Sequence, residues 1–229
     1  KLITGHSPSG YQTSMTFASL TSPYCPDPRR LPEMAIARHN EGCLFWVYIG
    51  HGQRRWLDSM RVGRQAFPIM NIDHIEEMKS SAGSPIAVFI ACYTGAFDER
   101  NDCLSEKMLA SPTGPVAVVG GSRVTMPYAN AVFAQGMLQH CFEHEHKTLG
   151  ELLLHAKREA AAGEGGGDNR ALLDAIAAAI SPNKDELDTE RTEHLALYNL
   201  LGDPLLRMPK PHSVEITVPK SQTAGDTLQ

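Results

Sequence analysis

Three short apolar runs recur along the chain, and no other feature of the sequence constrains the fold as strongly. They are Cys43–Gly50, Pro85–Cys92 and Pro115–Gly121, and stretches of helical character separate them. Strands without polar alternation are typical of a parallel sheet that is buried on both faces. The sequence therefore predicts an α/β fold in which helices cover both faces of a mostly parallel sheet.

The segments around these runs indicate further elements. We expect helices at Pro32–Asn40, Asn71–Ser81, Cys103–Ala110, Ala129–Cys141, Thr148–Ala162 and Arg170–Ile180. Short strands are expected at Lys1–Gly5 and Ser14–Leu20, and Val214–Val218 alternates like a strand. This organisation predicts one domain over residues 1–210. Residues 211–229 are then a tail or the start of a following β-sandwich domain.

Charge and hydropathy exclude several classes of protein. The 229 residues carry 21 Lys and Arg against 26 Asp and Glu, which gives no electrostatic reason to expect a nucleic-acid partner. The apolar runs are far shorter than the roughly 20 residues of a membrane-spanning helix. No signal peptide is visible, and a start at Lys1 is expected of a piece of a longer protein.

The five cysteines exclude two kinds of small scaffold. They are Cys25, Cys43, Cys92, Cys103 and Cys141. Because they are scattered and include no CxxC pair, neither a zinc ribbon nor a dense disulfide framework is indicated. Their odd number predicts at least one free thiol.

Chemically reactive residues follow two of the three apolar runs. Ligands of open α/β sheets bind outside the carboxyl ends of the strands, where this chain has His51, Cys92 and Gly120–Ser122. A cysteine nucleophile must be a thiolate, and a nearby imidazole favours that form. If the first two strands are parallel neighbours, His51 and Cys92 meet at one edge of the sheet.

Gly52 adds a second feature of such a site. A residue without a side chain lets a substrate carbonyl approach its N–H, and the N–H groups of Gly52 and Cys92 could form an oxyanion hole. Each feature also has a simpler interpretation. A cysteine at a strand end is often a small core residue, and His-Gly is often only a turn. The two together, in this order and at matching strand ends, favour a nucleophile with its base.

Several segments resemble one family of peptidases. Tyr48–Gly52 with Trp56, Asp58 and Ser59 matches its histidine strand, and Ile90–Cys92 with Gly95 and Phe97 matches its nucleophile strand. Pro112–Val119 and Asn199–Leu205 match two later segments. From about Phe45 to Leu206, the chain resembles the gingipain-type cysteine peptidases of peptidase family C25, which have a caspase-like fold.

The resemblance implies a caspase-like three-layer αβα sandwich and a cysteine endopeptidase. His51 and Cys92 would form the catalytic dyad, and Cys92 would form a thioester acyl-enzyme with a protein or peptide substrate. No cofactor or metal is required by this chemistry. The resemblance also implies secretion or attachment to the cell envelope, and an immunoglobulin-like domain beginning near Val214–Val218.

The chain departs from the family's pattern near the substrate. The loop Gly5–Ser9 holds no carboxylate that could support His51, so we expect a backbone carbonyl or another side chain to orient its ring. The expected substrate pocket contains no acidic residue, so an uncharged P1 side chain is predicted. Its residues are Gly121, Ser122, Met126 and Tyr128, with Ser14 and Met15 from the first loop. Asp98, Glu99 and Asp102 are the acids that could overturn this.

Four alternatives remain open. His140 and His144 are spaced to hold zinc on a helix, but we interpret the run His140–His146 as a solvated helix end. Asp98, Glu99 and Asp102 could bind calcium, although a charged surface loop is the commoner arrangement. The domain could also be a separase- or CHAT-type peptidase, against which Gly202-Asp203-Pro204 argues, or a non-catalytic caspase-like binding module of a larger surface or secreted protein.

Overall fold

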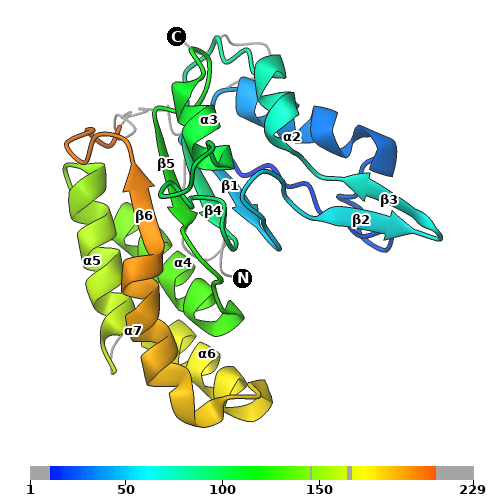
Figure 1. Cartoon of the computed structure of the whole chain (residues 1–229). Helices are drawn as coiled ribbons and strands as arrows, with labels where there is room; N and C mark the ends of the chain where they lie inside the picture. Colours follow the sequence, from blue (N-terminus) through cyan, green and yellow to red (C-terminus); the bar gives the residue numbers. More distant parts are fainter. Residues whose placement is uncertain (1–10, 145, 164–166, 210–229) are drawn as a thin grey trace, which may run out of the picture.

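A four-stranded sheet forms the centre of the molecule. The computed structural model describes residues 11–144, 146–163 and 167–209. Its sheet has the order β1-β4-β5-β6, with strands β1 (Phe45–Ile49), β4 (Ile86–Ile90), β5 (Ala117–Gly121) and β6 (Tyr198–Leu201). The first three are parallel and β6 is antiparallel to β5, which confirms the mostly parallel α/β sheet (Figure 1).

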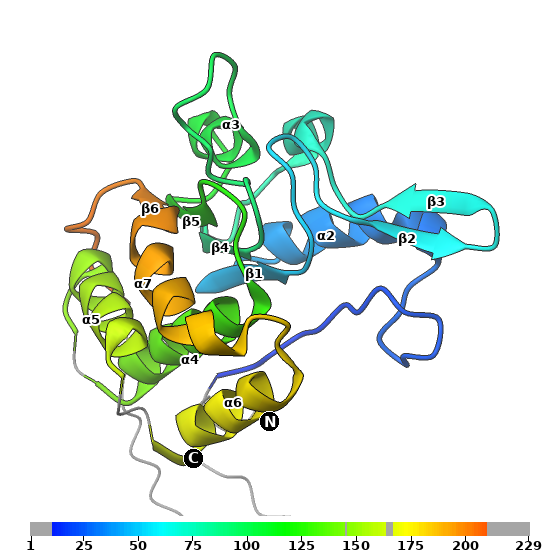
Figure 2. The same cartoon turned by 60° about the horizontal axis from the view of Figure 1, so that its bottom comes forward.

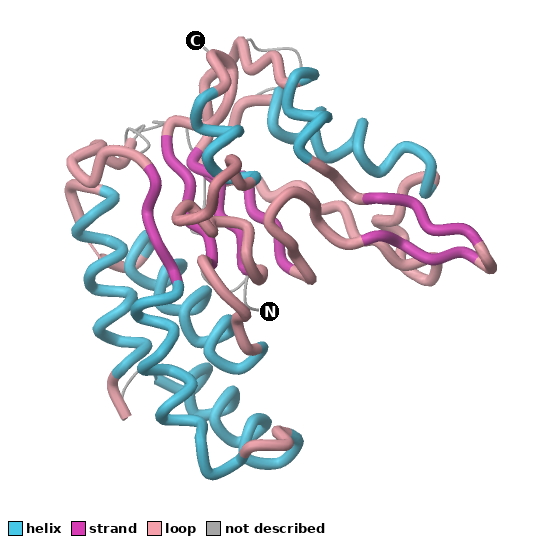
Figure 3. Tube along the Cα trace, in the orientation of Figure 1, coloured by secondary structure: helices cyan, strands magenta, loops and turns pink. Residues whose placement is uncertain are grey.

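Helices cover both faces of this sheet, so the three-layer architecture is also confirmed (Figure 2). One layer contains α4 (Pro127–Phe142), α5 (Leu149–Ala161) and α7 (Leu187–Leu197), with α6 (Gly167–Ile180) beyond α4. The other contains α2 (Leu31–Asn40), α3 (Leu104–Ala110) and the 3₁₀ turn η2 (Ile72–Glu77). The hairpin of β2 (Ser59–Val62) and β3 (Gln65–Pro68) extends beside α2 (Figure 3).

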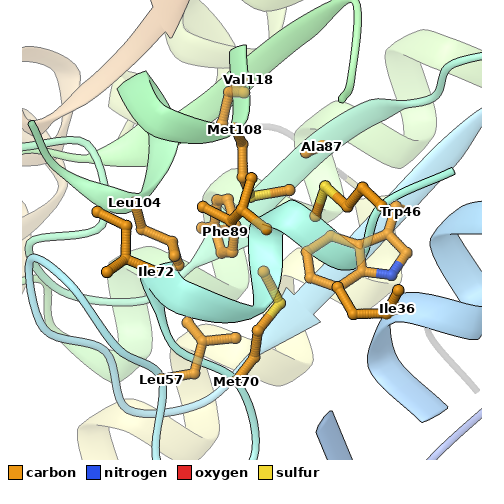
Figure 4. Packing of buried hydrophobic residues seen from close by; sticks show 12 residues of the cluster. Ile36, Trp46, Leu57, Met70, Ile72, Ala87, Phe89, Leu104, Met108 and Val118 are labelled. Carbon is orange, nitrogen blue, oxygen red and sulfur yellow. The ribbon is translucent and has the colours of Figure 1, made fainter. Parts of the chain in front are cut away.

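Alternate side chains of β4 enter the hydrophobic cores on the two faces of the sheet. Because both faces are buried, every residue of the strand is apolar. Phe89 packs with Trp46 of β1, at a ring-centroid distance of 5.6 Å, in the α2–α3 core (Figure 4). Val88 and Ile90 enter the opposite core, where Phe133 of α4 belongs to the same cluster. All five residues of β4 and all five of β5 are buried, as predicted.

β1 differs from the prediction of a strand buried on both faces. Trp46 is buried, but Val47 and Ile49 are 51% and 62% exposed. In the layer of α4 and α5, the buried cluster draws on β4 and β5, and Phe45 at the start of β1 packs against it. β1 therefore lies at an edge of the described sheet, with one of its faces covered.

Two predicted elements take other forms. The expected helix Asn71–Ser81 is only the turn η2, which Asn71 caps by accepting hydrogen bonds from the Asp73 and His74 N–H groups. It ends because Met78 is extended, at φ −64° and ψ 131°. Ser14–Leu20 is irregular rather than a strand. Lys1–Gly5, Val214–Val218 and the proposed tail at 211–229 lie outside the described residues.

The hairpin, α6's first turn, α7 and β6 were not predicted. The hairpin turns at Gly63, whose φ of +60° suits a two-residue connection. The other predicted helices form within a few residues of their expected ends. None of the described helices is long and apolar enough to cross a membrane.

Candidate active site

Strand register brings His51 and Cys92 to the same edge of the sheet. Ile49 of β1 pairs with Ile90 of β4, and the Gly50 N–H continues the ladder by donating to the Ile90 carbonyl at 3.3 Å. His51 and Cys92 each follow two residues after this pair. Both residues therefore leave adjacent parallel strands at their carboxyl ends, as the sequence predicted.

Gly52 lies directly against the nucleophile strand. A Cβ atom on Gly52 would stand 2.7 Å from the carbonyl oxygen of Cys92 and 2.9 Å from Cγ2 of Thr94. No side chain fits in that space, so glycine is required for the close approach. An isolated bridge between Gly52 and Leu57 closes the loop that follows His51.

The loop's hydrogen bonds fix the backbone of His51. Its carbonyl accepts from the Tyr48 hydroxyl at 2.7 Å and from the Asp58 N–H at 3.1 Å. Burial raises the pKa of Tyr48 to about 12, so the hydroxyl remains a donor at neutral pH. The His51 side chain itself is exposed, and no described residue forms a hydrogen bond with its ring. What orients the ring therefore stays a prediction.

Cys92 is half-buried and carries a free thiol. Its sulfur lies 3.3 Å from the Thr125 backbone nitrogen, 3.5 Å from the Thr125 carbonyl oxygen and 3.7 Å from the Thr125 hydroxyl. The chain turns sharply after it, because Tyr93 has a φ of +57°, a left-handed conformation that is uncommon outside glycine. The Tyr93 N–H donates to the Arg123 carbonyl at 3.0 Å, which holds this turn against the loop after β5.

Thr125 was not among the residues predicted for the site, although it lies within the stretch predicted to line the pocket. Buried and half-buried side chains hold it in place. Asn130 donates to the Thr125 hydroxyl at 3.0 Å, and Tyr198 donates to Asn130 at 2.6 Å. His194 accepts from the next N–H, that of Met126, at 2.8 Å. No sequence motif marks these partners, since they come from α4, α7 and β6.

The sequence profile of Peptidase family C25 matches residues 2–209. The chain belongs to peptidase family C25.

Solved structures agree with this assignment. The chain is similar to gingipain R (RgpB), described as an Arg-specific cysteine proteinase, at 18% identity and a TM-score of 0.56 over 77% of this chain and 36% of that one. It is similar to the complex of Porphyromonas gingivalis RgpB pro- and mature domains at 17% identity and a TM-score of 0.59, covering 90% and 41%. A structure described only as a protease matches at 15% identity and a TM-score of 0.52, and the match covers 89% of this chain and 43% of that one. No curated protein sequence matches the chain. The C25 chain thus spans less than half of these proteins, and at these identities the likeness establishes the fold.

The predicted pocket residues of the C25 chain face in different directions. A Cβ on Gly121 would lie 2.7 Å from the Ala91 carbonyl oxygen and 2.8 Å from Cγ2 of Thr125, so its backbone adjoins the nucleophile strand. The Ser122 hydroxyl donates to the Leu197 carbonyl at 3.0 Å. The Tyr128 hydroxyl donates to Asp174 of α6 and accepts from Arg191 of α7, both at 2.7 Å. The hydroxyls of Ser122 and Tyr128 are thus engaged with the helical layer.

Two of the three acids that follow Cys92, Asp98 and Glu99, are engaged with arginines. Asp98 forms a two-pronged ion pair with Arg123, and this hydrogen bonding lowers the pKa of the Asp98 carboxyl. Glu99 lies 3.6 Å from Arg54, in the loop after His51. Such exposed pairs add little stability, but they link the loops that follow β1, β4 and β5.

The histidine run near the end of α4 was predicted to be a solvated helix end, and for His140 this is wrong. His140 is buried, and its ring bonds Glu159 of α5 and His146, at 2.8 and 2.9 Å. His144 and His155 complete a cluster of four rings. Among the described residues, no group of three or more His, Cys, Asp or Glu side chains is arranged to hold a metal. α4 starts beside Thr125 and runs 16 residues, so this cluster lies far from Cys92.

Proposed function

We propose that this C25 chain is a cysteine endopeptidase whose nucleophile is Cys92 and whose acid–base group is His51. One observation carries the proposal. The two residues leave adjacent parallel strands in matching register, and Gly52 stands against the Cys92 carbonyl with no room for a side chain. Membership in peptidase family C25 supports the same reaction class.

The chemistry needs only these side chains and water. The Cys92 thiolate attacks the scissile carbonyl, and the tetrahedral intermediate collapses to a thioester as the C–N bond breaks. His51 carries the thiol proton and gives it to the leaving amine. His51 then takes a proton from water, whose oxygen attacks the thioester. This releases the carboxylic acid product and restores the thiol, so no cofactor or metal enters the cycle.

Backbone N–H groups of Gly52 and Cys92 are proposed to bind the oxyanion. The tight contact of Gly52 with Cys92 and Thr94 supports this, because it holds the two N–H groups on neighbouring segments. Donors of this kind contribute about 3–4 kcal/mol each to transition-state stabilisation.

The substrate is proposed to be a protein or peptide with an uncharged P1 side chain. A buried P1 cation would need a carboxylate partner, since an unpaired buried charge costs several kcal/mol. Gly121, Ser122, Met126 and Tyr128 provide none, and Asp98 and Glu99 already face arginines. By family, we place the protein outside the cell or on its envelope, and we propose that residues 211–229 are a tail or the start of a following immunoglobulin-like domain.

Cleavage of a peptide library by four forms of the chain tests this function. Cys92→Ala and His51→Ala should abolish cleavage. Cys43→Ala should not, because Cys43 is an exposed cysteine before the other end of β1. Cleavage after Ala, Leu or Asn should exceed cleavage after Arg or Lys. Faster cleavage after Arg or Lys would contradict the proposed preference for an uncharged P1 side chain. Peptide cleavage by Cys92→Ala would contradict the proposal that Cys92 is the nucleophile.

A further inference from the structure

The Cys92 sulfur is surrounded by polar atoms of a single residue, Thr125. The Thr125 N–H at 3.3 Å can only donate, and it therefore stabilises a thiolate. The Thr125 carbonyl at 3.5 Å can only accept, and it therefore suits the S–H form. The Thr125 hydroxyl at 3.7 Å could do either, so its direction decides which form of Cys92 it favours.

Two side chains, the buried Tyr198 and the half-buried Asn130, determine which bond that hydroxyl accepts. Tyr198 is fully buried and donates to Oδ1 of Asn130 at 2.6 Å. Burial raises the pKa of Tyr198, so its proton stays in place. The amide of Asn130 is then oriented with Nδ2 toward Thr125, to whose Oγ1 it donates at 3.0 Å. Oγ1 accepts this bond and keeps its own hydrogen to donate, and the acceptors beside it are the Cys92 sulfur at 3.7 Å and the Tyr198 oxygen.

The hydrogen bonds therefore form a series in which Tyr198 donates to Asn130, Asn130 donates to Thr125, and Thr125 is placed to donate to Cys92. Tyr198 starts β6, Asn130 lies in the first turns of α4, and Thr125 is in the loop that leaves β5. Gly121 of β5 pairs with Tyr198, which ties the source of the relay to the sheet that carries Cys92.

We propose that Thr125 is a catalytic residue that stabilises the Cys92 thiolate through its N–H and hydroxyl, and that Asn130 and Tyr198 are positioning residues that aim this hydroxyl. The assignment rests on the proposed function only in taking Cys92 as the reacting thiol. No substrate is needed to observe it, because a stabilised thiolate reacts with a simple alkylating agent.

The test is the rate at which iodoacetamide alkylates Cys92, followed by peptide mass spectrometry from pH 5 to pH 10. Thr125→Val removes the hydroxyl at nearly constant shape. The rate at pH 6–7 should fall about tenfold, as expected for loss of one hydrogen bond to a charged group, while the plateau at high pH stays unchanged. Tyr198→Phe should give a smaller fall, about threefold. Thr125→Ser keeps the donor and should behave like the parent chain.

Thr113→Val is the matched control, because it removes a hydroxyl that bonds the Met78 carbonyl away from the site. It should leave the labelling profile of Cys92 unchanged. If Thr125→Val gives the parent profile, or lowers the rate equally at every pH, the relay does not act on the thiolate and the assignment is wrong. Peptide cleavage by the parent chain would be unaffected by that result. Conversely, a chain that cleaves no peptide could still show the pH-dependent loss, which separates the two proposals.

Discussion

At the scale of single residues, backbone space matters as much as reactive side chains. Gly52 lets the histidine loop press against the exit of β4, and Tyr93 turns the chain immediately after Cys92 at a φ of +57°. His51 and Cys92 could be identified from the sequence because their types and strand-end positions are unusual together. Thr125, Asn130 and Tyr198 could not, because such residues occur throughout any chain and only folding brings these three together.

Gly52→Ala should strongly impair catalysis. The new methyl would stand 2.7 Å from the Cys92 carbonyl oxygen and 2.9 Å from the Ala91 Cβ, so the loop carrying His51 must move. We expect kcat/KM to fall at least about a hundredfold, the effect of losing one oxyanion donor. Peptide cleavage kinetics measure this.

Gly163→Ala is the matched control, because no atom of the described residues lies within 4 Å of a Cβ at that position. It should retain the parent kcat/KM. If Gly52→Ala is as active as Gly163→Ala, the close contact has no role in catalysis.

At the scale of elements, the central strands were predictable and the outer ones were not. β4 and β5 carry unbroken apolar runs because both faces are buried. β6 and α7 lack such a signal. β6 is a strand of only four residues at the edge of the sheet, and the run Asp188–Glu193 of α7 consists of six charged or hydroxyl side chains with no apolar residue among them. The helix expected after Asn71 stops as a 3₁₀ turn, since a cap alone does not sustain a helix.

The interface of α4 and α5 should make stability depend on pH. Burial lowers the pKa of His140 despite its contact with Glu159, and burial and the neighbouring histidines lower that of His146 despite Glu151. A histidine with a depressed pKa in the folded state takes up its proton more readily when unfolded. It therefore contributes full stability above pH 6.5, and this stability is lost as pH falls. Burial also lowers the pKa of His39 and of His194, so their contributions to stability change with pH in the same direction.

The melting temperature should therefore fall between pH 7 and pH 5. In a His146→Gln variant the fall should be smaller, since one of these groups is removed. Differential scanning calorimetry at several pH values measures both. A melting temperature that is flat over this range, or a variant with the parent slope, would contradict the account.

At the scale of the whole molecule, the sheet gathers three loops at one edge. The loops after β1, β4 and β5 carry His51, Cys92 and Thr125, of which Cys92 and Thr125 are in contact, and the Asp98–Arg123 and Glu99–Arg54 pairs link these loops. The histidine cluster lies at the other end of α4. This division places the proposed chemistry at the carboxyl ends of the parallel strands, where α/β sheets bind their ligands.

The most direct test of the central claim is covalent labelling of the intact chain with a peptide that bears an electrophilic acyl group and an uncharged P1 residue. At neutral pH, mass spectrometry should find one adduct, on Cys92, formed far faster than on the other four thiols. His51→Ala should slow it sharply, while Cys43→Ala should not. Equal labelling of several cysteines, or labelling of Cys92 that His51→Ala leaves unchanged, would contradict a Cys92–His51 dyad.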